Sequence, residues 1–239
     1  GPVPNISLVY AATSKPEDNQ AALYFNSVRN WAYLDFACLG RYNTVFQDYL
    51  NQNGVKITIH PEDQALMTSA FPDFVAMNFY TTVTVEQPTM EGDMTNGISD
   101  QQSEDIMERG FYKGFTNPYL KKNAFNWTID PLGLKTTLQT LYDRYHLPIL
   151  ITENGLGAED HLEENGAVHD PYRIDYLQQH IQQCLAAIES GVELIGYSPW
   201  SAIDLISVHE GIKKRYGFIY VDRNDVDEKE QKRVKKDSF

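Results

Sequence analysis

The sequence has little cysteine, a shortage of basic residues and no long apolar run. Its two cysteines, Cys38 and Cys184, lie far apart in helix-like apolar patterns, so we expect buried side chains and neither a disulfide framework nor a metal site. Against 33 acidic residues stand only 20 lysines and arginines, and the net charge of −13 argues against nucleic acid and anionic membranes as partners. No stretch approaches the roughly 18 apolar residues of a membrane span, and no signal peptide opens the chain. A cytoplasmic protein without cofactor is the simplest expectation.

What the sequence does contain is an alternation of short apolar runs with helical patterns. Four runs are apolar or β-branched without polar alternation, which is typical of parallel strands covered on both faces. They span residues 4–9, 74–79, 148–152 and 192–197. Strands that alternate with helices predict an α/β domain with a parallel sheet.

Four helices are predicted between these strands. The first begins at the capping box Ser-Lys-Pro-Glu of residues 14–17 and runs to about Phe36, and the second covers residues 43–50. The third and fourth each carry an apolar stripe at helical spacing. The stripes consist of Leu134, Leu138, Leu141 and Tyr145 in the third helix, and of Ile174, Leu177, Ile181, Leu185 and Ile188 in the fourth, which spans residues 170–191.

Polar and aromatic side chains gather where the strands end. These residues are Asn78 and Tyr80, Glu153 and Asn154, and Trp200. Functional side chains at the carboxyl ends of several strands are typical of a (β/α)8 barrel, and four strands predict half of one across residues 1–239. Residues 83–116 read as a long polar rim loop, residues 222–236 as a solvated loop, and residues 233–239 as the start of a helix that breaks off.

One strand end carries a carboxylate. Residues 149–152 are apolar or β-branched, Glu153 follows, and Asn154-Gly155 turns the chain. Burying an ionised carboxylate without partners is costly, so Glu153 must meet donors or solvent. From spacing alone, a functional carboxylate and a structural one that caps a neighbouring helix are equally good interpretations.

Residues 151–155, Ile-Thr-Glu-Asn-Gly, strongly resemble the nucleophile motif of glycoside hydrolase family one, the β-glucosidase family. The resemblance extends over nearly the whole chain and makes it the C-terminal half, strands five to eight, of a (β/α)8 TIM barrel, with residues 1–9 as strand five. Its other motifs are Asn78-Phe79-Tyr80, residues 127–134, residues 168–170 with Arg173, Tyr176 and His180, and residues 196–200.

The resemblance implies double displacement, with Glu153 as the nucleophile and a second carboxyl group about 5 Å away as the acid. It implies that Tyr80 donates a hydrogen bond to Glu153 and that Asn78 and Trp200 line the substrate site; for the two aromatic residues, core packing is the alternative. The family's acid residue lies in a Thr-x-Asn-Glu-Pro motif, which this sequence lacks. Because loss of the general acid costs about 10²–10⁴-fold in rate, we expect this chain alone to have little or no activity.

Ser207 occupies the position at which ordinary β-glucosidases of this family carry a glutamate, and Lys214 and Tyr216 follow. The pattern resembles the phosphate-binding signature of 6-phospho-β-glycosidases, and an ammonium with two hydroxyls suits a phosphate. The alternative is a solvated basic loop, an assignment that Lys213 and Arg215 keep.

Two further residues of this stretch bear on specificity. The small residue Val208 favours glucosides over galactosides within the resemblance, and His209 reads as a loop residue without a catalytic role.

The leading hypothesis is a fragment of a retaining 6-phospho-β-glucosidase that hydrolyses 6-phospho-β-D-glucosides. A non-catalytic sugar-phosphate-binding module, a half that works only with a separate N-terminal half, and a 6-phospho-β-galactosidase or dual-specificity enzyme are the alternatives. The expected partners are the phosphorylated substrate and the missing N-terminal half. Because apolar barrel edges would be open, we also expect either self-association or a structure in which these edges are masked.

Overall fold

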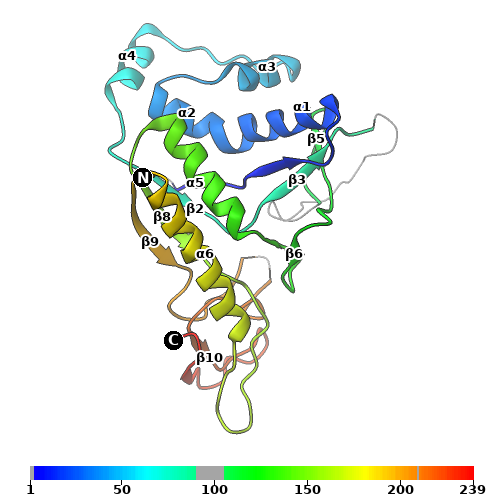
Figure 1. Cartoon of the computed structure of the whole chain (residues 1–239), viewed down its shortest axis with the longest axis vertical. Helices are drawn as coiled ribbons and strands as arrows, with labels where there is room; N and C mark the ends of the chain where they lie inside the picture. The colour runs from blue at the N-terminus through cyan, green and yellow to red at the C-terminus, as the bar shows by residue number, and fades with distance from the viewer. Residues whose placement is uncertain (1–2, 90–104, 209) are drawn as a thin grey trace.

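The computed structural model describes residues 3–89, 105–208 and 210–239. A parallel sheet of β2 (Val75–Asn78), β8 (Ile149–Asn154) and β9 (Leu194–Pro199) forms its centre in the order β2-β8-β9 (Figure 1). Residues 4–6 run parallel to β2, where Asn5 forms a bridge with Asn78 and the backbone NH of Ile6 donates to the Asn78 carbonyl at 3.0 Å. The four predicted strands therefore lie side by side in chain order, although the first is only a short bridge.

Two long helices, α5 (Pro131–Tyr145) and α6 (Pro171–Glu189), cover one face of this sheet. Burial alternates along β2 and β8, because successive side chains of a strand point to opposite faces. Val75, Met77, Ile149 and Ile151 are buried against the helices, whereas the alternate residues of the other face are only half-buried. The expectation of strands covered on both faces is correct for one face.

The predicted stripe of α6 is wrong, although the extent of the helix is confirmed. The buried residues are Arg173, Tyr176, His180, Cys184 and Ala187. The last three residues of the predicted stripe are exposed instead, with exposed fractions of 43% at Ile181, 55% at Leu185 and 45% at Ile188. Cys38 and Cys184 are free and buried, as expected.

The first predicted helix is three consecutive elements: α1 (Pro16–Phe25), the π-helical turn η1 (Asn26–Trp31) and α2 (Ala32–Leu39). Its capping box is absent, since the N-cap residue is Lys15 and its side chain forms no capping hydrogen bond. The hydroxyl of Thr13 accepts from the Lys15 NH at 3.1 Å instead. Gly40 ends the helix with a φ of 64°, a conformation that favours glycine.

Two shorter helices follow. In α3 (Thr44–Gln52), the Asn43 side chain caps the helix by accepting from the Phe46 NH at 2.8 Å, in agreement with the predicted start. The sequence did not predict α4 (Pro61–Ser69). That helix has no buried residue, so it lacks the apolar periodicity by which a helix is recognised.

A second sheet packs against α1 in the order β1-β3-β5-β4. Its strands are β1 (Val9–Ala11), β3 (Val83–Glu86), β4 (Met107–Glu108) and β5 (Tyr112–Gly114), and a short hairpin of β6 (Lys121–Lys122) and β7 (Thr128–Ile129) follows. The interpretation of residues 83–116 as an irregular rim loop is therefore wrong at both ends. Residues 90–104 of that segment lie outside the described residues.

The C-terminal segment pairs β10 (Ile219–Val221) with β11 (Arg233–Lys235) in an antiparallel ladder. The predicted helix at residues 233–239 is thus wrong. Residues 222–236 are largely exposed, but Lys236 is 3% exposed, because its charge meets buried carboxylates. Within the described ranges, no helix is both long enough and apolar enough to cross a membrane.

Candidate active site

Glu153 and Tyr80 meet at the carboxyl ends of β8 and β2. These strands are neighbours, and Asn78 pairs with Glu153 in the parallel register, which brings Tyr80 beside the carboxylate. The Tyr80 hydroxyl donates to Glu153 Oε2 at 2.5 Å. Burial raises the pKa of Tyr80 well above its ordinary value of 10, and the hydrogen bond to Glu153 raises it further. Tyr80 therefore keeps its proton and uses it to donate a hydrogen bond to the half-buried carboxylate of Glu153.

The fully buried Asn154 ties neighbouring elements together behind Glu153. Its amide nitrogen donates to the Phe79 carbonyl at 2.7 Å and to the Tyr176 hydroxyl of α6 at 3.0 Å. Its amide oxygen accepts from the Tyr197 hydroxyl of β9 at 2.7 Å. One side chain thus fixes the ends of β2 and β9 and a helix relative to the carboxylate.

Asn78 lies on the half-buried face of the sheet, where its amide oxygen accepts from the Thr152 hydroxyl at 2.7 Å. The same hydroxyl lies 3.0 Å from the Met77 carbonyl. The Asn78 side chain is therefore held on the same face as Thr152, next to Glu153 in register. Its part in substrate binding stays a prediction.

An aromatic cluster of Tyr80, Trp127 and Tyr216 adjoins the carboxylate, with Trp200 packed against it. The Tyr80 ring lies edge-on to the other two, with centroid distances of 5.7 Å to Trp127 and 6.1 Å to Tyr216. Core packing and a polar contact coexist in Tyr80, because its ring belongs to the cluster while its hydroxyl reaches Glu153. The two interpretations that the sequence left open do not exclude each other here.

Lys214 inserts its charge into this cluster. The residue is 2% exposed, and its Nζ lies 3.3 Å from the Trp127 ring centroid and 4.8 Å from that of Phe125. A cation over an aromatic face is attracted by the negative π-surface. A Cβ at Gly157 would come within 2.8 Å of the Lys214 side chain, so glycine is needed for this close approach. Lys214 is therefore packed in place.

Contacts run continuously from the carboxylate to the cation. Glu153 binds Tyr80, Tyr80 packs on Tyr216, and the Lys214 Nζ lies 5.9 Å from the Tyr216 ring centroid. The structure brings these four predicted site residues together, and Trp200 packs against the same cluster.

Ser207 is placed by its loop. Its backbone NH donates to the Gly211 carbonyl at 2.9 Å and its carbonyl accepts at 3.1 Å, which closes a tight turn. Val208 in that turn is 94% exposed, and His209 lies outside the described residues. The contact of Ser207 with a phosphate remains a prediction.

The assignment of Arg215 to a solvated loop is wrong. Arg215 is 5% exposed and pairs with Asp204 at 2.8 Å, whereas Lys213 is exposed and pairs with Glu159 at 2.9 Å. Sequence reasoning also missed Phe125 and Trp127 as the platform for Lys214.

Three comparisons with known proteins bear on this site. The family model described as glycosyl hydrolase family 1 matches residues 1–239. The aryl-phospho-β-D-glucosidase BglC of Bacillus subtilis is 41% identical over 100% of this chain and 51% of its own length, and a 6-phospho-β-glucosidase of Dickeya chrysanthemi is 39% identical over 98% and 47%. Among solved structures, a β-glucosidase of Exiguobacterium marinum matches with a TM-score of 0.81 at 30% identity, over 98% of this chain and 48% of that one. The chain spans about half the length of the curated relatives it matches.

Proposed function

Since the chain belongs to glycosyl hydrolase family 1 and forms a partial (β/α)8 barrel, we propose that it supplies the nucleophile and the phosphate-binding residues of a retaining 6-phospho-β-glucosidase. The substrates are 6-phospho-β-D-glucosides, in keeping with the names of the curated relatives. Catalysis requires a second polypeptide segment that completes the barrel.

One observation carries this proposal: a carboxylate and a buried cation share one aromatic cluster. Glu153 accepts from Tyr80, and Tyr80 packs on Tyr216, over which the Lys214 ammonium lies. A hexose 6-phosphate has its reactive C1 and its charged O6 group at opposite sides of the ring. A site with a nucleophile at one end and a cation at the other suits that substrate.

In the first step, a Glu153 oxygen attacks the anomeric carbon while an acid protonates the leaving oxygen, and a glycosyl ester forms. Water then hydrolyses this ester and regenerates the carboxylate. Tyr80 holds the attacking carboxylate in orientation through its hydrogen bond. Lys214, Tyr216 and Ser207 bind the phosphate through charge-assisted hydrogen bonds, and Trp200 and Asn78 line the sugar site between them.

The acid must come from outside this sequence, because a Thr-x-Asn-Glu-Pro motif is absent from it. An N-terminal half-barrel would pair with the outer edge of β9 and pack on the half-buried face of β2 and β8. That segment closes the barrel and brings the acid opposite Glu153.

Complementation tests the proposal. The part of Bacillus subtilis BglC that this chain does not match is co-expressed with the chain, and hydrolysis of p-nitrophenyl 6-phospho-β-glucoside is measured. Neither half alone should turn over substrate, and the pair should. Glu153→Gln in the pair should abolish turnover and leave binding of glucose 6-phosphate intact.

Other outcomes point to other functions. Binding of the phosphorylated sugar by the pair without any turnover would favour a non-catalytic binding module. Turnover by the chain alone would contradict the need for a second segment. Equal rates on phosphorylated and unphosphorylated glucosides would remove the phosphate site from the proposal.

A further inference from the structure

A buried ionic network lies directly behind the phosphate-binding segment. It joins three carboxylates and three cations: Asp160, Asp170, Asp204, Arg173, Arg215 and Lys236. Every member is at most 6% exposed. The charges of these groups cancel, so the network adds no net attraction for an anion, and its contribution must lie in geometry.

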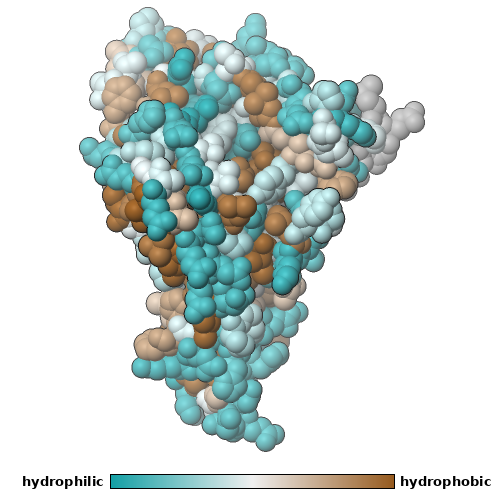
Figure 2. All heavy atoms as spheres, viewed as in Figure 1, coloured by the Kyte–Doolittle hydropathy of each residue, from teal (hydrophilic) through white to brown (hydrophobic). Residues whose placement is uncertain are grey.

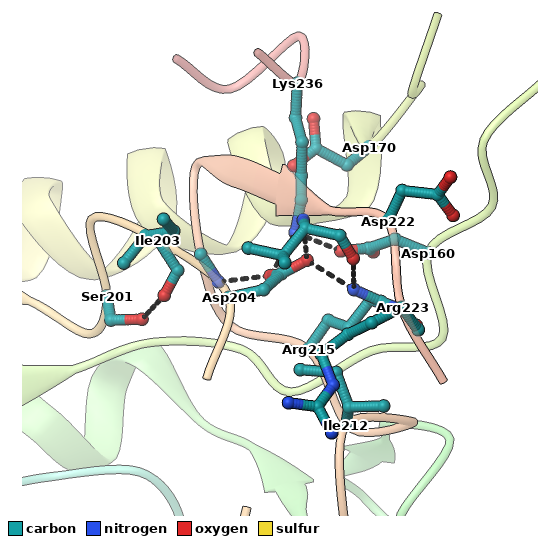
Figure 3. A network of polar contacts seen from close by, with 12 residues as sticks. Asp160, Asp170, Ser201, Ile203, Asp204, Ile212, Arg215, Asp222, Arg223 and Lys236 are labelled. Atoms are coloured by element: carbon teal, nitrogen blue, oxygen red, sulfur yellow. Dashed lines mark hydrogen bonds and ion pairs between the residues drawn. The ribbon is translucent and has the colours of Figure 1, made fainter. Parts of the chain in front are cut away.

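Asp204 is the centre of this network. Its carboxylate accepts from Arg215 at 2.8 Å and from the Lys236 Nζ at 2.7 Å (Figure 3). It also accepts from the backbone NH groups of Gly217 at 3.0 Å and Val221 at 3.3 Å. One carboxylate thus fixes the backbone on the C-terminal side of Tyr216 and the end of β10.

Arg215 lies between Lys214 and Tyr216 and points the other way. Beyond Asp204, its guanidinium donates to the carbonyls of Val221 at 2.9 Å and Arg223 at 2.7 Å. Its backbone pairs in both directions with Ala158, on the loop that follows Glu153. Because this bridge and these hydrogen bonds hold both the backbone and the side chain of Arg215, they restrain the two residues bonded to it, Lys214 and Tyr216.

The network also connects this segment to the rest of the site. Lys236 reaches from the C-terminal segment to Asp160 as well as Asp204 (Figure 3). Asp160 in turn accepts from Arg173 of α6 at 3.0 Å. The loop after the nucleophile, the first turn of α6 and the cation-bearing segment are thereby held in one frame.

We propose that Asp204, Arg215 and Lys236 are positioning residues that hold Lys214 and Tyr216 at the distance from Glu153 that a 6-phosphorylated hexose requires; this inference rests on the proposed function. They do not touch the substrate. They determine whether the cation is where the phosphate needs it, and so they set selectivity for phosphorylated substrates.

The test uses the complemented enzyme and two substrates, p-nitrophenyl β-glucoside with and without the 6-phosphate. Asp204→Asn and Arg215→Lys should each raise KM for the phosphorylated substrate about tenfold or more, because a displacement near 1 Å costs up to about 10²-fold. The kcat for the phosphorylated substrate and kcat/KM for the unphosphorylated one should change less than about twofold, because the variants leave Glu153 in place and disturb only the contact with the phosphate.

Lys213→Gln is the matched control. It removes a positive charge from the same segment, yet Lys213 is exposed and its ion pair with Glu159 lies outside the network. If Arg215 acted only through its long-range field, Lys213→Gln would lower phosphate selectivity as strongly as Arg215→Lys or more. We expect Lys213→Gln to have almost no effect.

The double variant Asp204→Asn/Arg215→Lys provides a second measurement. The effects of substituting two residues that act through one contact are not additive. The KM of the double variant for the phosphorylated substrate should therefore be close to that of the single variant with the larger increase in KM. Equal losses on both substrates in both single variants would overturn the inference and leave a merely structural role. Lys214→Gln distinguishes failure of the phosphate site from failure of the positioning role. If this variant also leaves selectivity for the phosphorylated substrate unchanged, the phosphate site is wrong. If it alone removes selectivity, only the positioning role is wrong.

Discussion

At the scale of single residues, the contact between Tyr80 and Glu153 depends on one phenolic proton. Tyr80→Phe removes the donor and keeps the ring within its aromatic cluster. A hydrogen bond to a charged group contributes about 1.5–3 kcal/mol, so kcat of the complemented enzyme should fall about 10- to 100-fold. Steady-state hydrolysis of the 6-phospho-β-glucoside measures this. Tyr119→Phe is the control, since that tyrosine is 92% exposed, and an unchanged kcat in Tyr80→Phe would contradict the orienting role.

Ser207 supports a second residue-scale prediction, on charge. Ser207→Glu places a carboxylate opposite a phosphate that carries nearly two negative charges. The kcat/KM for the phosphorylated glucoside should fall at least about tenfold more than that for the unphosphorylated one, because like charges in contact are strongly unfavourable. Ser207→Gln has the same length without the charge. A similar loss of selectivity in that variant would attribute the effect to size and not to charge.

Which residues could be predicted follows from how far their signal extends along the chain. Glu153 and Tyr80 stand at the ends of apolar strands, and parallel neighbours bring such ends together, so their proximity follows from the strand pattern. Their hydrogen bond was expected from the family resemblance, and the structure contains it. Arg215 is different. Its burial depends on Asp204 and on the carbonyls of Val221 and Arg223 later in the chain, whereas a hydropathy pattern assigns an arginine within a run of basic residues to solvent.

At the scale of elements, helix α6 shows the same limit. Its ends were predicted by Pro171 and the turn at Gly191, but its buried face was not, because that face carries Arg173, Tyr176 and His180. Each of these is buried by partners distant in sequence: Asp160, the Asn154 amide and the Phe79 ring. An apolar stripe predicts the packed face only where no such polar partner exists.

His180 on this face gives a prediction for stability against pH. Burial lowers the pKa of His180 from 6.5 to about 4, against smaller opposing effects of the Tyr176 carbonyl and Asp130. Between these values the unfolded chain binds a proton that the folded chain does not, so stability falls as the pH drops from 6.5 towards 4. The loss should reach roughly 3 kcal/mol.

Urea unfolding of the chain at several pH values measures this change. In His180→Phe the dependence between pH 6.5 and 4 should become shallower by about that amount, since a phenyl ring fits between Phe79 and Tyr176 without titrating. His161→Phe, at an exposed position, should keep the full dependence. Parallel curves for the wild type and His180→Phe would show that acid destabilisation arises elsewhere.

At the scale of the whole molecule, the fold was predicted as half a barrel, and the four strands in chain order agree with this. The second sheet was not predicted, because β4 and β5 have only two and three residues and follow a polar stretch. Such strands form only because apolar side chains of α1 cover them, as the Phe25 ring covers Tyr112. Their signal is tertiary and lies outside any local window.

An open half-barrel leaves apolar surface without a cover. Figure 2 shows hydrophobic residues reaching the surface along the side where β8 and β9 lie. Ile195 of β9 is 54% exposed, and within the described residues β9 pairs with β8 alone. An exposed apolar strand edge is a template for another strand.

We therefore expect the chain alone to sediment as dimers or larger species at micromolar concentration, and to form a one-to-one complex when the N-terminal part of BglC is present. Ile195→Lys should weaken both associations, because a charge on β9 opposes burial of that edge. Val226→Lys is the control, as Val226 is 98% exposed in a loop away from the sheet. A monomeric chain that still forms an active complex with the N-terminal part would mean that the edge does not pair with a second copy of this chain. A monomer that forms no active complex would show that this edge is not the docking surface.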